Sequence, residues 1–149
     1  MPIDMDNMLA GFSNQVISAT GGEIDFGDGA SATIVIGACV LRAEDVLDVG
    51  FVVTETANED STVSIGRSGA SSTVPTHFIG YELSSTVAAG AVRRVSDGTL
   101  SWSATADTEA ERSCPLGTTI TCQVTDGDGT GKIVPFVIMR PQGPLDPIA

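Results

Sequence analysis

The sequence is poor in positive charge and in aromatic side chains, and each shortage argues against a class of function. Only 7 Lys and Arg stand against 19 Asp and Glu, which gives a formal net charge of −12. A field of that sign repels phosphate backbones and anionic lipid headgroups, so we expect neither nucleic-acid nor membrane binding. With one Trp and one Tyr, the chain offers few rings on which bases or sugars could stack.

Long apolar runs are also missing, so we expect no transmembrane helix, which needs roughly 18 such residues in a row. The acidic start, residues 1–8, has neither the basic nor the apolar region of a signal peptide. The chain of 149 residues is long enough for one domain, and its 42% hydrophobic content excludes a disordered protein.

The residues that carry most enzyme chemistry are scarce, so we expect no enzyme, no cofactor and no metal site. His77 is the only histidine, and there is no Gly-x-Ser-x-Gly elbow and no phosphate-binding Gly-Lys-Ser/Thr loop. The Gly- and Asp-rich run 126–132 lacks the EF-hand spacing and is typical of a tight turn. A small hydrolase that uses His77 and nearby carboxylates remains an alternative.

Three cysteines cannot all pair within one chain. Cys39 lies in an apolar run and is typical of a small buried residue. Cys114 and Cys122 flank a turn and could face each other across a hairpin. We expect reduced thiols, and the sequence leaves open whether these two pair.

Short apolar runs separated by Gly, Asp and Asn predict many short strands and little helix. Three runs alternate between apolar and polar residues, as strands do when one face lies on a core. The expected strands are Glu23–Phe26, Thr33–Leu41, Val49–Glu55, Thr62–Gly66, His77–Leu83, Ala91–Val95, Leu100–Ala104, Thr118–Val124 and Ile133–Met139. Trp102 in this pattern is predicted to be a core anchor.

Two of these runs, Thr33–Leu41 and Ile133–Met139, are apolar on both faces, so another sheet or another subunit must cover them. Pro135 cannot donate to a strand ladder, which favours a sheet edge or a bulge at that position. We therefore predict subunit contacts in the last strand and just after it, at Ile133, Pro135, Val137, Met139 and Pro141.

The two ends differ from the middle and are predicted to be extended arms. Residues 1–15 carry apolar side chains without a strand pattern, and residues 140–149 contain three prolines. Short helices are conceivable at Asp4–Ala10 and Asp107–Ser113. The expected organisation is an N-terminal arm (1–15), a β-sandwich domain (16–139) and a Pro-rich tail (140–149).

The order of segments resembles one known family. A short arm leads to Gly-Gly-Glu-Ile-Asp-Phe-Gly (21–27), then to Val-Gly-Phe-Val-Val-Thr-Glu (49–55) and a long Ser/Gly loop. The last third runs through Asp-Gly-Asp-Gly-Thr-Gly (126–131) to a final strand, Val-Pro-Phe-Val-Ile-Met (134–139). Over residues 16–139 this is similar to the jelly-roll decoration (cement) proteins of tailed-bacteriophage capsids.

This resemblance implies an all-β fold, an antiparallel, jelly-roll-like β-sandwich with extended N- and C-terminal arms. It also implies a structural virion protein, made in the host cytoplasm, that binds the outer capsid surface as an oligomer, commonly a homotrimer. Its partners would be the major capsid protein and further copies of itself. We expect shell contacts at Met5, Met8, Leu9 and Phe12, because an apolar arm without its own core needs a surface to cover it. The alternative is a carbohydrate- or receptor-binding β-sandwich of a phage head fibre or tail.

Overall fold

The computed structural model is a β-sandwich, and it describes residues 16–28, 31–38, 44–58, 61–68, 76–83, 85–103, 106, 112–114, 119–125 and 130–141. In these residues the regular elements are strands and one 3₁₀ turn, and no helix is long and apolar enough to cross a membrane. The elements are β1 (Ile17–Thr20), β2 (Ile24–Asp25), η1 (Phe26–Asp28), β3 (Ser31–Ala38), β4 (Glu44–Glu55), β5 (Thr62–Ser68), β6 (Thr76–Glu82), β7 (Val92–Arg94), β8 (Ser113–Cys114), β9 (Thr119–Thr125) and β10 (Lys132–Pro141).

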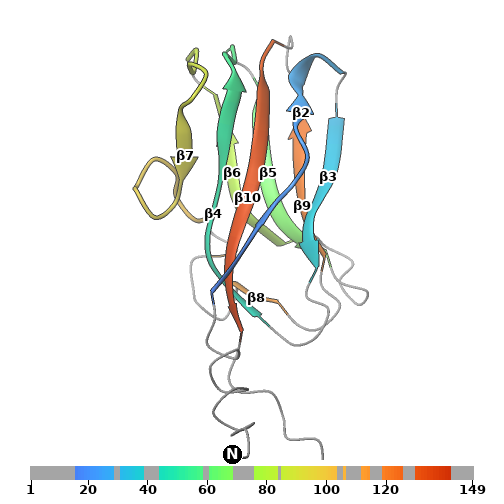
Figure 1. Ribbon diagram of the computed structural model, residues 1–149, viewed down its shortest axis with the longest axis vertical. Helices are drawn as coiled ribbons and strands as arrows, with labels where there is room; N and C mark the ends of the chain where they lie inside the picture. Colours follow the sequence, from blue (N-terminus) through green and yellow to red (C-terminus); the bar gives the residue numbers. More distant parts are fainter. Residues whose placement is uncertain are drawn as a thin grey trace, which may run out of the picture.

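Two antiparallel sheets face each other (Figure 1). The first sheet has the order β1-β10-β4-β7, with β2 paired to β10 and β8 paired to β4. The second sheet has the order β3-β9-β5-β6. The chain crosses repeatedly from one sheet to the other, as in a jelly roll. The all-β, antiparallel, jelly-roll-like sandwich expected from the sequence is confirmed.

The core lies between the sheets and follows from the alternation along each strand. On β4 the side chains of Val49, Phe51 and Val53 are fully buried, and on β9 those of Ile120 and Cys122 are as well. The intervening residues of β9, Thr119, Thr121 and Gln123, are only half-buried. A period of two therefore places the apolar residues inward and the Thr and Gln residues outward, as predicted for this strand.

The predicted strand Leu100–Ala104 is wrong in the part that the structure describes. Residues 100–103 form no strand, because their backbone makes isolated hydrogen bonds with two different partners. The Leu100 amide donates to the Arg94 carbonyl, and the Ser103 amide donates to the Phe78 carbonyl. Leu100 is nevertheless buried, whereas Trp102 is half-buried, so the tryptophan packs at the margin of the core.

Pro135 pairs with Phe51 on β4, but on its other side it lies between Lys132 and Ile133, which pair with β2, and Phe136–Met139, which pair with β1. The predicted sheet edge or bulge is therefore present locally, as a break in pairing on one side of a strand that is not itself an edge strand. β10 runs between β1 and β4, and its register shifts fall at Lys132/Ile133 and Ile138/Met139. The Pro135 carbonyl accepts a hydrogen bond from the Gly21 amide at 2.9 Å. The carbonyl and the nitrogen of Pro135 therefore point toward the gap between β1 and β2, away from β4. Because the nitrogen of Pro135 does not point to β4, its lack of an amide hydrogen costs no hydrogen bond to that strand.

Several other expectations concern the ends and the loops. β10 continues through Arg140 and Pro141, which pair with Asp45 and Glu44, so the sandwich extends two residues beyond the expected boundary. Ser113, placed in a short helix from the sequence, begins β8. The arm 1–15 with the candidate helix Asp4–Ala10, the tail from 142 onward, and Cys39 lie outside the described residues.

Candidate interaction surface

The two sheets present different surfaces to the outside. On the second sheet the half-buried outward residues are polar, namely Thr62, Ser64, Thr121 and Gln123. On the first sheet the outward residues midway along β10 are apolar, while charged residues, Lys132 and Arg140, lie toward its two ends. A sandwich needs apolar side chains only on its inner faces, so an apolar outer face indicates contact with something else.

This apolar surface is built around Phe136 on β10. Inward residues of β10 are fully buried, while the alternate residues Val134, Phe136 and Ile138 are half-buried. Val134 pairs with Val52 on β4, and Val52 pairs with the exposed Val92 on the edge strand β7. We call this surface the Phe136 face; its apolar residues are Val52, Val92, Val134, Phe136 and Ile138.

Gly50 lets the Phe136 ring and the β7 strand lie close to β4. A Cβ atom at Gly50 would lie 2.2 Å from the Arg93 carbonyl oxygen, 2.8 Å from Cζ of Phe136 and 2.9 Å from Cβ of Arg94. Real Cβ atoms essentially never approach backbone this closely. The absence of a side chain at Gly50 is therefore what allows the Phe136 ring and β7 to pack this closely on β4.

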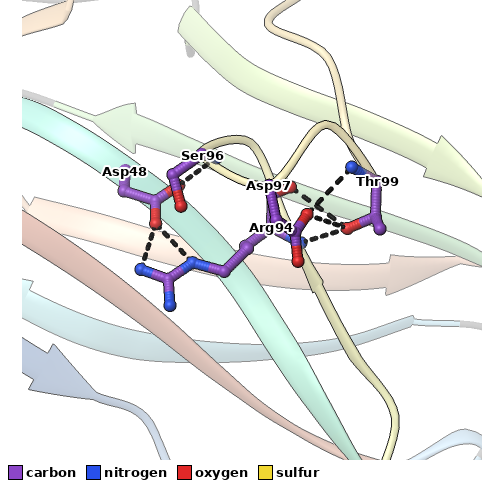
Figure 2. A network of polar contacts seen from close by, with 5 residues as sticks. All are labelled: Asp48, Arg94, Ser96, Asp97 and Thr99. Atoms are coloured by element: carbon purple, nitrogen blue, oxygen red, sulfur yellow. Dashed lines mark hydrogen bonds and ion pairs between the residues drawn. The ribbon is translucent and has the colours of Figure 1, made fainter.

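Asp48 and Arg94 form an ion pair within the face, and Figure 2 shows their contacts. The Arg94 guanidinium donates from Nε to Asp48 Oδ2 at 2.7 Å, and its second nitrogen lies 2.5 Å from the same oxygen. Asp48 is 3% exposed, and its other oxygen accepts from the Ser96 amide at 3.0 Å. The same guanidinium lies over the Phe136 ring, 5.3 Å from its centroid. The face thus carries a matched ion pair within an apolar surround.

The loop after β7 is held by its own hydrogen bonds, which fixes the margin of the face. Asp97 accepts from both the hydroxyl and the amide of Thr99, and these bonds lower the pKa of Asp97. The Thr99 hydroxyl also bonds to the backbone of Arg94. Gly98, with φ of +80°, allows the turn that brings Thr99 back to β7.

A second polar cluster surrounds Lys132 where β10 begins. Lys132 lies 3.5 Å from Glu55, and Thr54 donates to Glu23 at 2.8 Å. The pKa of Lys132 is raised by Glu55 first, and then by Glu23 and Asp25. No group of three His, Cys, Asp or Glu side chains in the described residues could hold a metal ion.

The residues predicted from the sequence as subunit contacts lie inside the protomer. The side chains of Ile133, Val137 and Met139 belong to the core between the sheets, and Pro135 and Pro141 are buried as well. A side chain enclosed in its own protomer cannot form the surface of a contact, so this assignment is wrong. The outward residues of β10 are instead the alternate ones, Val134, Phe136 and Ile138, one position away from those predicted.

Other predicted site residues fall on different parts of the fold. Met5, Met8, Leu9 and Phe12 lie outside the described residues. The backbone of His77 belongs to β6 and pairs with Gly66, and its side chain is outside the described part of the chain. Cys114 and Cys122 are buried and form no disulfide, and they lie on different sheets instead of facing each other across a hairpin.

The sequence analysis missed Asp48, Arg94 and Phe136. The adjacent cations Arg93 and Arg94 were a visible signal, because two arginines side by side are unusual in a chain with seven cations. The partner of Arg94, Asp48, lies 46 residues away in sequence, and only the sheet brings it close.

Comparison with known proteins shows no family for the chain. No protein-family model matches the chain, and no curated protein matches it. Among solved structures, the chain is similar to Eiger TNF from S. frugiperda, with 8% sequence identity and a TM-score of 0.42. The match covers 90% of this chain and 97% of that one.

Proposed function

We propose that the protein is a structural virion component that binds the outer surface of a phage capsid as an oligomer and stabilises contacts between major capsid subunits. The observation that carries the proposal is the Phe136 face, an apolar outer surface with a matched ion pair on a molecule of net charge −12. Such a face is typical of a protein that works in contact with other protein surfaces.

The resemblance of the segment order to capsid decoration proteins supports the same function. An acidic outer protein would not compete for the packaged DNA, because like charges repel. Shell contacts are assigned to the N-terminal arm at Met5, Met8, Leu9 and Phe12. Copy–copy contacts involve the folded sandwich, and the resemblance implies a trimer.

Binding to capsids tests this proposal. The protein is mixed with shells assembled from the major capsid protein of the same genome, and co-sedimentation is measured. We expect the full chain to sediment with the shells, and the chain lacking residues 1–15 to remain in the supernatant while its circular dichroism shows an intact sandwich.

A matched control separates the apolar side chains from the length of the arm. Replacing Met5, Met8, Leu9 and Phe12 with Ser should abolish co-sedimentation, whereas replacing Asn7, Asn14 and Gln15 with Ser should preserve it. If the shortened chain still decorates shells, the arm is not the shell contact. If the full chain fails to bind shells but binds glycans or host cells, the protein is instead a carbohydrate- or receptor-binding module.

A further inference from the structure

We infer that the Phe136 face packs against a second copy of this chain, and this inference deepens the oligomer included in the proposed function. The inner side of β10 is covered by the second sheet, and its outer side also carries apolar residues that need a cover. β10 has fully buried residues on one side and Val134, Phe136 and Ile138 on the other. The second side is half-buried in the protomer and reaches fuller burial only against another surface.

The distribution of charge favours a second copy of the chain as the partner of the Phe136 face. Two copies, each with a net charge of −12, repel each other wherever carboxylates face one another. Within the Phe136 face the Asp48 carboxylate is 3% exposed and is neutralised by Arg94, so two such faces meet without this repulsion. The carboxylates around Lys132, Glu55 and Glu23, lie at one end of the same side of the sheet, beyond Val134, so a basic partner would be drawn to that end and not to the apolar centre.

The size of the sheet suits a contact with an apolar centre and a polar rim, which is the usual anatomy of an interface. Val134 to Ile138 extend about 17 Å and the strands β10, β4 and β7 span about 14 Å, so the apolar centre covers about 240 Å², while the whole sheet covers at most about 650 Å². A standard interface buries about 800 Å² of accessible surface on each partner. Protruding side chains make the accessible surface of a sheet larger than its projected area. Among the residues of the second sheet whose side chains the structure describes, on β5, β6 and β9, there is no comparable apolar outer surface.

Native mass by size-exclusion chromatography with light scattering tests the inference on the full chain. The wild type should have a mass of at least twice the 15.2 kDa of one chain. Val134→Glu places a carboxylate in the centre of the face and should return the mass to that of the monomer. Thr121→Glu adds the same charge to an interior strand of the second sheet and should leave the oligomer intact.

A second variant protects the test against misfolding. Val92 is 38% exposed on the three-residue edge strand β7, so Val92→Glu should fold and also reduce the mass to the monomer. A monomeric wild type at every concentration overturns the inference, as does an oligomer that survives both Val134→Glu and Val92→Glu. A monomer that still decorates shells refutes this inference alone, whereas an oligomer dissociated by these variants that never binds shells refutes only the capsid function.

Discussion

Arg94 contributes to the fold at the level of a single residue, because it is the cation that pairs with the buried carboxylate of Asp48. Burying a carboxylate is unfavourable unless its charge is matched, so loss of the partner is more costly than the pair's own net contribution. Asp48 would keep the Ser96 amide and lose both contacts from the guanidinium. The Phe136 ring would lose its cation as well.

We therefore predict that Arg94→Ala lowers the free energy of unfolding by about 3 kcal/mol, measured by urea denaturation. Arg93→Ala is the matched control, because it removes the same charge from the next residue, whose guanidinium contacts only the Val92 carbonyl at 3.5 Å among the bonds described. Its effect should stay below about 1 kcal/mol. Equal losses for the two variants would show that the charge of the strand matters and the ion pair does not.

Gly50 and Gly80 differ in what surrounds them, and this gives a second prediction. Gly50→Ala forces a Cβ against the Arg93 carbonyl and the Phe136 ring, so β7 must move away from β4. We expect a loss of about 2–3 kcal/mol in thermal or urea denaturation. Gly80→Ala meets nothing within 4 Å and should be neutral or stabilising by up to about 1 kcal/mol. A tolerated Gly50→Ala would contradict the close packing of β7 on β4.

At the scale of the elements, the positions of the strands were largely predictable. For one strand, β10, the sequence did not predict which side chains point into the core. On β9 the alternation of Ile120, Cys122 and Val124 with polar neighbours identifies the inward side directly. On β10 both sets of alternate residues are apolar, so the sequence pattern cannot say which set faces the core. Only the position of the strand between β1 and β4 makes Ile133, Val137 and Met139 the inward set.

Short elements and distant pairs also escape the sequence pattern. β1 has only four residues and β8 only two, and both form because β10 and β4 offer a free ladder. The reverse happens at Leu100, where the alternation is present but no strand runs beside it. The Asp48–Arg94 pair depends on the register between β4 and β7, which no local pattern specifies.

Cys122 on β9 makes the stability of the sandwich depend on pH. Burial raises the pKa of the Cys122 thiol from 9.0 to about 12, because the core disfavours the thiolate. The unfolded chain ionises first, so this contribution to stability is complete below pH 9.0 and is lost as the pH rises toward about 12.

We predict that Cys122→Val removes this part of the alkaline loss of stability, measured as the free energy of unfolding between pH 9.0 and about 12. The wild type should lose stability more steeply than the variant over that window, and the two should run parallel below it. Parallel curves over the entire range would mean that the thiol ionises as readily in the folded protein as in the unfolded chain.

At the scale of the whole molecule, the sandwich carries the apolar Phe136 face on the outer side of one sheet of a strongly acidic body. Association through the Phe136 face is then driven by apolar burial and opposed by the net charge. Salt screens the repulsion between copies, so the oligomer should become tighter as ionic strength rises. Sedimentation velocity at low and high sodium chloride measures this, and dissociation by salt would indicate an interface made by ion pairs.

Cryo-electron microscopy of capsid shells, with and without the added protein, tests the proposed function most directly. We predict additional density on the outside of the shell, formed by clusters of sandwiches whose β1-β10-β4-β7 sheets face one another within each cluster. The chain without residues 1–15 should leave the shell bare. Shells that look identical with and without the full protein, at concentrations where it is oligomeric, would contradict the assignment to the capsid surface.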